Sequence, residues 1–364
     1  MLAATLVGLF LALPVALLML ALWLVRGSVF VLFRFFSRTP TPWHDVVEFC
    51  AAVGWRPKGR VDAYCPGEGV FHATTGASGW RGIASSEVCD VLVFGDSFAF
   101  GYGVDDKRMF SWGDQPRVKA VGAPGYNMVQ ELLLLREYAD ALTGKLVVWL
   151  IFLGNDLYEN LQPNMMRYRT PFVRERAGDG PNGWEIVTSH LRNAGWPYNF
   201  EQHAKIYRTR LAEICTACPQ SERAFAACAF LLAEGQKLCR DAEAQLAVVT
   251  VPERLQLSRK GRAMLRSLSP APQAFSADFP DRQIARICGK LNLTFVAGAE
   301  HLTLRDYLRF DPHWNERGHK RMRELLCSLY REFVEAAQLT PGLPQVRDEL
   351  RPAADPERAA SVPG

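Results

Sequence analysis

The sequence lacks the features typical of nucleic-acid-binding and repeat proteins. It has no long basic run, its formal net charge is only +4, and its arginines are scattered among acidic residues as on a solvated surface. No segment is repeated. Its 364 residues, 49% of them hydrophobic and 22% charged, suffice for one large globular α/β domain with additions or for two smaller domains. We therefore expect no nucleic-acid partner.

The first 25 residues lack charge altogether and are dominated by Leu, Ala and Val. Such a run is long enough to cross a bilayer as a helix. A cleaved signal peptide would need a basic start, a shorter apolar core and a small-residue cleavage site. None of these is clear, because Arg26 and then the apolar stretch 29–33 follow directly. We predict a retained N-terminal transmembrane helix within a membrane anchor over residues 1–37.

The side of the membrane is less well defined by the sequence. Arg26, Arg34 and Arg38 all follow the apolar run, and this placement favours a cytoplasmic domain. The nine cysteines are more typical of an oxidising compartment. We favour the extracytoplasmic (periplasmic) side, while the orientation and the oligomeric state stay open.

The cysteines follow no standard metal-binding pattern. Cys215-x-x-Cys218 is followed by Cys228 and Cys239, and gaps of this length match no zinc finger. Disulfides across a helical hairpin, or buried thiols, are the alternatives. A bridge between Cys65 and Cys89 is also open. We expect neither a metal nor a cofactor.

Strand and helix patterns alternate along most of the chain. We expect strands at 89–94, 117–121, 146–153, 245–251 and 293–297, and helices at 107–114, 126–142, 201–215, 221–243, 280–291, 302–308 and 316–337. This alternation predicts an α/β fold, a three-layer α/β/α sandwich with a mostly parallel sheet. The predicted parts are a stalk and leading segment (38–88), the main domain (89–338) with a lid-like insertion (157–200) and a helical hairpin (201–243), and a disordered tail (339–364).

Polar residues follow three of the apolar strands. Val91–Phe94 leads into Gly95-Asp96-Ser97, Gly125 follows the second strand, and Asn155 follows the third. The carboxyl ends of parallel strands collect at one edge of a sheet, where α/β proteins place their sites. A serine there is a candidate nucleophile, and the N–H groups of Ser97 and Gly125 with the Asn155 amide are candidate oxyanion donors. Taken singly, Gly125 is better explained as a turn glycine after Pro124, and Asn155 is also compatible with a helix cap.

A candidate base precedes the last predicted helix. In Asp311-x-His313, the imidazole would take the proton of Ser97, and Asp311 would orient the ring and stabilise its charged form. His319 lies within the helix, and we expect it to be structural. A metal site on Asp311, His313 and His319 explains fewer residues than a serine nucleophile does.

Together, Gly95-Asp96-Ser97, Gly125, Gly154-Asn155-Asp156 and the Asp-His pair resemble the SGNH hydrolases, the GDSL-type esterase/lipase superfamily, over roughly residues 89–335. The resemblance implies an SGNH (flavodoxin-like) fold, with Ser97 as nucleophile, Gly125 and Asn155 in the oxyanion hole and His313 as base. Upstream, Gly54–Lys58 and Gly79–Gly82 look like the leading segment of membrane-associated bacterial members.

The spacing of acid and base departs from the commonest family pattern, because one residue rather than two separates Asp311 from His313. Asp-x-His-Trp is similar to the motif of polysaccharide O-acetyltransferases of this superfamily, the alginate-modifying type. We expect a serine-dependent hydrolase of a carbohydrate- or lipid-linked acyl ester. An O-acyltransferase modifying a cell-surface polysaccharide is the alternative, and a non-catalytic glycan- or lipid-binding module is the second.

Overall fold

The computed structural model describes residues 41–82, 88–165, 168–176, 183–191 and 200–339, with Leu17, Met19, Leu20, Leu22 and Trp23 near the N-terminus. The chain divides into two compact units, Met1–Thr41 and Pro42–Gly364. None of the helices in the described parts is long and apolar enough to span a membrane. Most of the predicted anchor (1–37) and nearly all of the predicted tail (339–364) lie outside the described residues.

A five-stranded parallel sheet forms the centre of the second unit. Its strands lie in the spatial order β13-β12-β7-β5-β6. In chain order they are β5 (Val91–Gly95), β6 (Val118–Gly122), β7 (Leu146–Phe152), β12 (Gln245–Val251) and β13 (Thr294–Ala297). Every residue of β5, β6 and β7 is buried, which explains their nearly continuous apolar sequences. The predicted α/β fold with a parallel sheet is confirmed.

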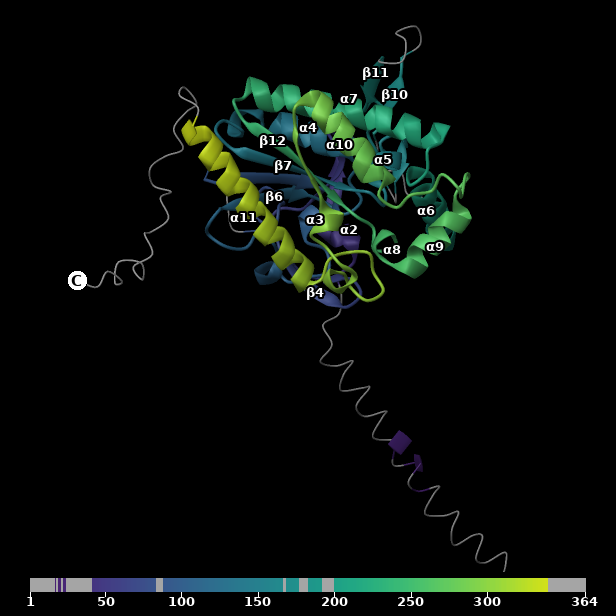
Figure 1. Ribbon diagram of the computed structural model, residues 1–364. Helices are drawn as coiled ribbons and strands as arrows, with labels where there is room; N and C mark the ends of the chain where they lie inside the picture. The colour runs from purple at the N-terminus through teal and green to yellow at the C-terminus, as the bar shows by residue number, and fades with distance from the viewer. Residues whose placement is uncertain are drawn as a thin grey trace, which may run out of the picture. The chain divides into compact units, whose positions relative to one another are not determined.

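Helices cover both faces of this sheet (Figure 1). On one face pack α4 (Met128–Glu137), α7 (Pro219–Asp241) and α10 (Phe279–Leu291), whose side chains share a core with Leu92 and Val147. On the other face pack α11 (Glu316–Leu339) and the short α3 (Ser97–Phe100), around Val93 and Val148. The result is a three-layer α/β/α arrangement.

The leading segment, residues 42–82, belongs to the same unit as the sheet, so the predicted boundary at 88/89 falls inside that unit. It contains α2 (Trp43–Val46) and two hairpins, β1 (Val47–Cys50) with β2 (Gly54–Pro57) and β3 (Asp62–Pro66) with β4 (Val70–Thr74). Its two Gly-Trp-Arg sequences meet, because a Cβ on Gly79 (φ +88) would lie 2.1 Å from the carbonyl oxygen of Pro57. Trp55 and Trp80 are buried, as expected of an integral part of the fold.

The described parts of the insertion 157–200 contain two hairpins. The strands β8 (Asn164–Met165) and β9 (Tyr168–Arg169) form one, and β10 (Phe172–Glu175) pairs with β11 (Trp184–Val187) in the other. Val173 and Trp184 are buried in the same core as α4 and α7, so this hairpin packs on the domain. Residues 166–167, 177–182 and 192–199 of the predicted lid lie outside the described residues.

Most of the remaining element predictions agree with the structure to within a few residues. The short α5 (Asp156–Glu159) follows β7, and α6 (Phe200–Ile214) and α7 form the predicted helical hairpin. The helix predicted at 126–142 ends at Glu137, and the chain tightens into the 3₁₀ helix η2 (Ala139–Ala141). The helices predicted at 107–114 and 302–308 are only the 3₁₀ turns η1 (Asp106–Arg108) and η5 (Leu304–Asp306).

Two helices and one turn in 252–300 were not predicted, namely α8 (Arg254–Leu257), α9 (Arg259–Leu268) and η4 (Gly298–Glu300). In α9 only Gly261 and Leu265 are buried. Gly261, Met264, Leu265 and Leu268 nevertheless recur at helical spacing, so the sequence does carry the signal of an amphipathic helix there.

The cysteines form no disulfides, so the bridges considered above do not exist. All nine lie in the described residues as free thiols, and seven of them are buried. Cys65 and Cys89 belong to separate clusters of the core, which explains why they do not pair. Burial raises the pKa of both thiols to about 11. Within the described ranges, no three His, Cys, Asp or Glu side chains are arranged to hold a metal ion.

Candidate active site

Ser97 lies at the carboxyl end of β5, where the chain turns into α3. Asp96 caps that helix by accepting a hydrogen bond from the Phe98 N–H (2.9 Å). Gly95 is tightly enclosed, because a Cβ there would lie 3.1 Å from Ala99 Cβ and Leu150 Cβ. Ser97 is itself mostly buried, with 7% of its surface exposed. The strand and the cap together hold the hydroxyl in one place.

The structure brings Ser97, His313 and Asp311 together from positions 216 residues apart in the chain. His313 Nε2 lies 2.6 Å from Ser97 Oγ, and His313 Nδ1 is in contact with Asp311 Oδ1. Burial acts to raise the pKa of Asp311, but hydrogen bonds and charge interaction with His313 outweigh it and leave that pKa below its usual value. An ionised Asp311 can only accept, so Nδ1 carries the hydrogen and Nε2 is free to accept the Ser97 proton.

Two aromatic rings lie close to the imidazole of His313. The Tyr102 ring centroid lies 4.2 Å from that of His313, and the Phe98 centroid lies 4.9 Å away. Both rings come from the segment that begins at Ser97, so the residues directly after Ser97 also position His313. Sequence reasoning did not identify Tyr102 or Phe98, since neither carries a motif.

The leading segment holds the backbone beside Asp311. Glu68, in the turn between β3 and β4, accepts from the N–H groups of Arg309 (2.9 Å), Phe310 (2.5 Å) and Asp311 (3.0 Å). Partial desolvation acts to raise the pKa of Glu68, but these three hydrogen bonds outweigh it and lower that pKa. Glu68 therefore fixes the loop that delivers Asp311, a role for which the sequence gives no signal.

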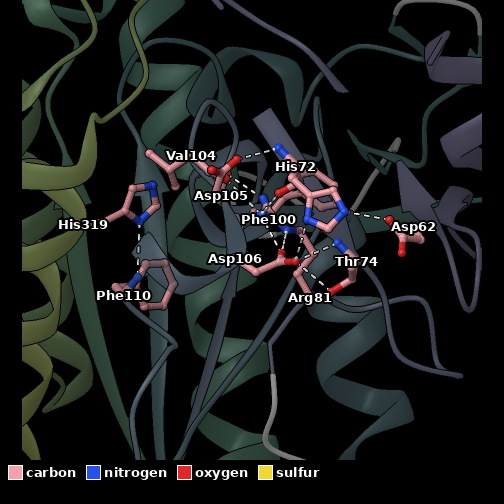
Figure 2. Close-up of polar contacts among 11 residues, drawn as sticks. Asp62, His72, Thr74, Arg81, Phe100, Val104, Asp105, Asp106, Phe110 and His319 are labelled. Carbon is pink, nitrogen blue, oxygen red and sulfur yellow. Dashed lines mark hydrogen bonds and ion pairs between the residues drawn. The ribbon is translucent and has the colours of Figure 1, made fainter. Parts of the chain in front are cut away.

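A second connection from the leading segment runs through Arg81, which is fully buried (Figure 2). Its Nε donates to Asp106 Oδ1 at 2.8 Å, and Thr74 donates to the other oxygen of that carboxylate. The remaining guanidinium donors reach four backbone carbonyls, those of Phe100, Gly101, His72 and Val104. Because the carbonyls of Phe100, Gly101 and Val104 flank Tyr102, Arg81 fixes the loop that carries this ring against His313.

The strand register places Gly125 at the same sheet edge as Ser97. Gly95 pairs with Gly122, and a Cβ on Gly122 would lie 2.2 Å from the carbonyl oxygen of Gly95. Gly125 follows three residues later, is buried, and has φ +78, a conformation that favours glycine. Among the described contacts, no hydrogen bond joins Gly125 or Asn155 to Ser97, so their oxyanion roles stay predictions.

The Asn155 side chain points to a carboxylate that sequence reasoning missed. Its Nδ2 donates to Glu159 Oε2 at 2.7 Å, while its buried Oδ1 has no hydrogen-bond partner. Burial raises the pKa of Glu159 to about 7, although the Asn155 hydrogen bond and the Arg210 charge oppose this. Asn155 and Glu159 also line a cavity of about 20 Å³ together with α6, room for one water molecule.

Three more carboxyl groups are buried, and Glu131 and Asp156 each interact electrostatically with Asp96. Burial raises the pKa of Asp96 to about 6 and raises those of Glu131 and Asp156 well above their usual values. Trp149 Nε1 donates to Glu131 at 2.5 Å, and the Phe152 N–H donates to Asp156 at 2.7 Å. Carboxyl groups with raised pKa values therefore gather around Asp96, the residue before Ser97.

His319 packs in the core, in agreement with the prediction that it is structural. Its Nδ1 accepts from the Phe110 N–H at 3.4 Å, and its ring stacks on Phe110 (Figure 2). Burial lowers its pKa to about 3, so the ring is neutral.

Comparison with known proteins gives matches only among solved structures, since no family model and no curated protein matches the chain. A putative acylhydrolase from Bacteroides fragilis is 13% identical, with a TM-score of 0.35, and the match covers 69% of this chain and 90% of that one. A GDSL-like lipase from Bacteroides thetaiotaomicron is 16% identical, with a TM-score of 0.34 and coverage of 69% and 91%. A psychrotrophic esterase EstA from Pseudoalteromonas sp. is 12% identical, with a TM-score of 0.33 and coverage of 67% and 98%. We base the functional proposal on the contacts within this chain.

Proposed function

We propose that the chain is a serine-dependent hydrolase of acyl esters, with Ser97 as nucleophile. The observation that carries this proposal is the continuous chain of contacts from Ser97 Oγ through both ring nitrogens of His313 to Asp311. A hydroxyl 2.6 Å from a correctly oriented imidazole nitrogen is within reach of a general base.

In the first half-reaction, His313 Nε2 takes the Ser97 proton as Oγ attacks the ester carbonyl carbon. The Asp311 carboxylate stabilises the imidazolium that forms, and Tyr102 and Phe98 keep the ring from turning away. The imidazolium then gives its proton to the departing alkoxide as the ester C–O bond breaks. An acyl group remains on Ser97.

The developing oxyanion needs hydrogen-bond donors at the same sheet edge. The backbone N–H groups of Ser97 and Gly125 and the second amide hydrogen of Asn155 are the donors we assign to it. Glu159 uses only one of the two Nδ2 hydrogens of Asn155, which leaves the other for substrate.

In the second half-reaction, His313 takes a proton from the molecule that attacks the acyl carbon, and it returns that proton to Ser97 Oγ as the acyl–serine bond breaks. Water gives hydrolysis, and a sugar hydroxyl gives O-acyl transfer by the same steps. Hydrolysis is the primary proposal because water needs no acceptor site. Release of free acid against acyl-sugar formation, measured with an added glycan, separates the two outcomes.

Labelling with a fluorophosphonate tests the nucleophile directly. We expect purified wild-type protein to be labelled at Ser97, and Ser97→Ala and His313→Ala to lose labelling and at least about 10³-fold of ester turnover. Ser267→Ala, which removes an exposed hydroxyl on α9, is the matched control and should behave as wild type.

A folded wild-type protein that neither labels nor turns over any acyl ester would reject the enzyme. That result would favour the non-catalytic glycan- or lipid-binding module instead. A trapped acyl-serine would exclude the module.

A further inference from the structure

A large cavity that Ser97 does not line lies at the carboxyl ends of β12 and β13. It has a volume of about 1180 Å³, and its walls come from α8, α9, the start of α10 and the chain 299–305. Ligand pockets in proteins commonly measure roughly 300–1,000 Å³, so this groove is large enough for a small-molecule or oligomeric ligand. The helices α8 and α9 lie together at one end of the unit (Figure 1).

Arginine dominates the polar lining of this cavity. Arg259, Arg262 and Arg266 come from α9, and Arg305 and Arg317 come from the chain opposite. Spacings of three and four residues put the α9 arginines on one face of the helix, over about 10 Å of its length. All five side chains are exposed to solvent, so both walls of the groove carry positive charge. We call this cavity the arginine groove.

Little of that positive charge is neutralised locally. Arg317 pairs with Asp306 (2.7 Å), but Arg259 and Arg305 form no ion pair among the described residues. Two acidic residues also line the groove, and the five arginines outnumber them. Asp278 is paired with Arg282, and Asp281 accepts from Thr250 (2.5 Å) while burial raises its pKa to about 6.

The other two arginines are positioned without being neutralised. Arg262 donates one hydrogen bond to the Gln256 carbonyl (3.0 Å), and the Arg266 guanidinium lies over the Phe275 ring, 5.6 Å from its centroid. These contacts hold the guanidinium groups in place and leave most of their donors unused. Pro252, Phe275 and Leu302 supply an apolar floor.

A planar guanidinium binds carboxylate and phosphate groups through paired, charge-assisted hydrogen bonds. Several such groups around an apolar floor are suited to a ligand that carries more than one oxyanion. We propose that the arginine groove binds an anionic ligand of small-molecule or short-oligomer size that bears carboxylate or phosphate groups. This proposal goes beyond ester hydrolysis and does not require Ser97 to be a nucleophile.

The arginine groove and the residues Asp311 and His313 lie on one loop, so a ligand bound in the groove contacts the loop that carries the proposed base. Leu302–Arg305 line the groove, and Asp311 and His313 follow within the same connection. Tyr307, between them, donates its hydroxyl to the Pro252 carbonyl (2.6 Å) at the groove floor. An anionic substrate held in the groove would therefore extend beside the catalytic loop.

Binding to the full-length protein, measured by isothermal titration calorimetry, tests the proposal. The probes are trigalacturonate for carboxylates, tripolyphosphate for phosphates and neutral maltotriose as the ligand control. We expect saturable binding of at least one anion and none of maltotriose, with affinity that falls as salt rises. The anion that binds more tightly identifies which oxyanion the groove prefers.

Two sets of variants locate the binding. The triple variant Arg259→Gln, Arg262→Gln, Arg266→Gln should weaken anion binding by roughly tenfold or more, and Arg305→Gln alone, from the opposite wall, by several-fold. The matched control Lys237→Gln, Arg286→Gln, Lys290→Gln removes the same charge from exposed positions outside the groove and should leave binding unchanged.

Absence of saturable binding by either anion, or equal weakening in the two triple variants, would overturn the proposal. Fluorophosphonate labelling of Ser97 in the same samples reports on the nucleophile separately. Loss of anion binding with labelling intact would refute only the groove, and the reverse pattern would refute only the proposed reaction.

Discussion

The two sides of Ser97 are built in different ways. On the side of the proposed base, both ring nitrogens of His313 are engaged, two aromatic rings lie close to the imidazole, and Glu68 holds the backbone of Asp311. On the proposed oxyanion side, the amide of Asn155 is held by one contact to Glu159, four residues away, and its Oδ1 has no partner.

The two sides differ in how their side chains are positioned. Residues far apart in the chain converge on the base, so His313 is placed by the tertiary structure and Asp311 stays ionised. The oxyanion side depends on one local hydrogen bond to a carboxyl group whose pKa is raised to about 7. We infer that the side of His313 is held rigidly, and that the side of Asn155 responds to the ionisation of Glu159.

The largest effect should come from breaking the base side at Asp311. Asp311→Asn keeps the size of the side chain but can donate to His313 Nδ1, which favours the tautomer with its hydrogen on Nε2. That tautomer cannot take the Ser97 proton, so we expect kcat to fall by about 10³–10⁴-fold with little change in KM. Steady-state hydrolysis of a chromogenic ester measures this.

Asp62→Asn serves as the matched control for that substitution. Asp62 pairs with His72 at the surface of the leading segment, outside the triad, and should affect kcat less than about twofold. Similar losses in both variants would show that Asp311 does not orient the base.

A smaller effect is expected on the oxyanion side from Asn155→Ala. This variant removes the proposed side-chain donor while leaving His313 and Asp311 in contact, so kcat should fall by about 10²–10³-fold. Circular dichroism should be unchanged. A raised KM with an unchanged kcat would instead place Asn155 in ground-state binding and leave the oxyanion to backbone groups.

The contrast between the two sides also explains what the sequence could predict. Gly95-Asp96-Ser97 and Asp311-x-His313 follow or precede strongly patterned elements, so their meeting at one sheet edge follows from the parallel topology. Glu68 and Glu159 could not be found this way. The role of Glu68 depends on which turn reaches the loop of Asp311, and the raised pKa of Glu159 depends on burial by α6. Both are tertiary contacts, so no local sequence pattern indicates them.

The smallest effect, and the one that sharpens the comparison most, concerns the ionisation of Glu159. A carboxyl group whose pKa is about 7 in the folded protein, against an ordinary 4.5, binds more protons folded than unfolded between those values. The protonated carboxyl group therefore makes its full contribution to the free energy of unfolding below about pH 4.5. This contribution declines as pH rises and is lost above about pH 7.

Glu159→Gln cannot ionise, yet its side-chain oxygen can still accept from Asn155 Nδ2, so kcat should stay within a few-fold of wild type. Urea unfolding at pH 5 and pH 8 should show the variant gaining stability relative to wild type at the higher pH, on the order of 1–3 kcal/mol. Glu335→Gln, at an exposed position on α11, should show no such dependence. A stability difference between Glu159→Gln and wild type that is equal at both pH values would mean that Glu159 ionises as an ordinary carboxyl group, and the Asn155–Glu159 contact would then not respond to pH in this range.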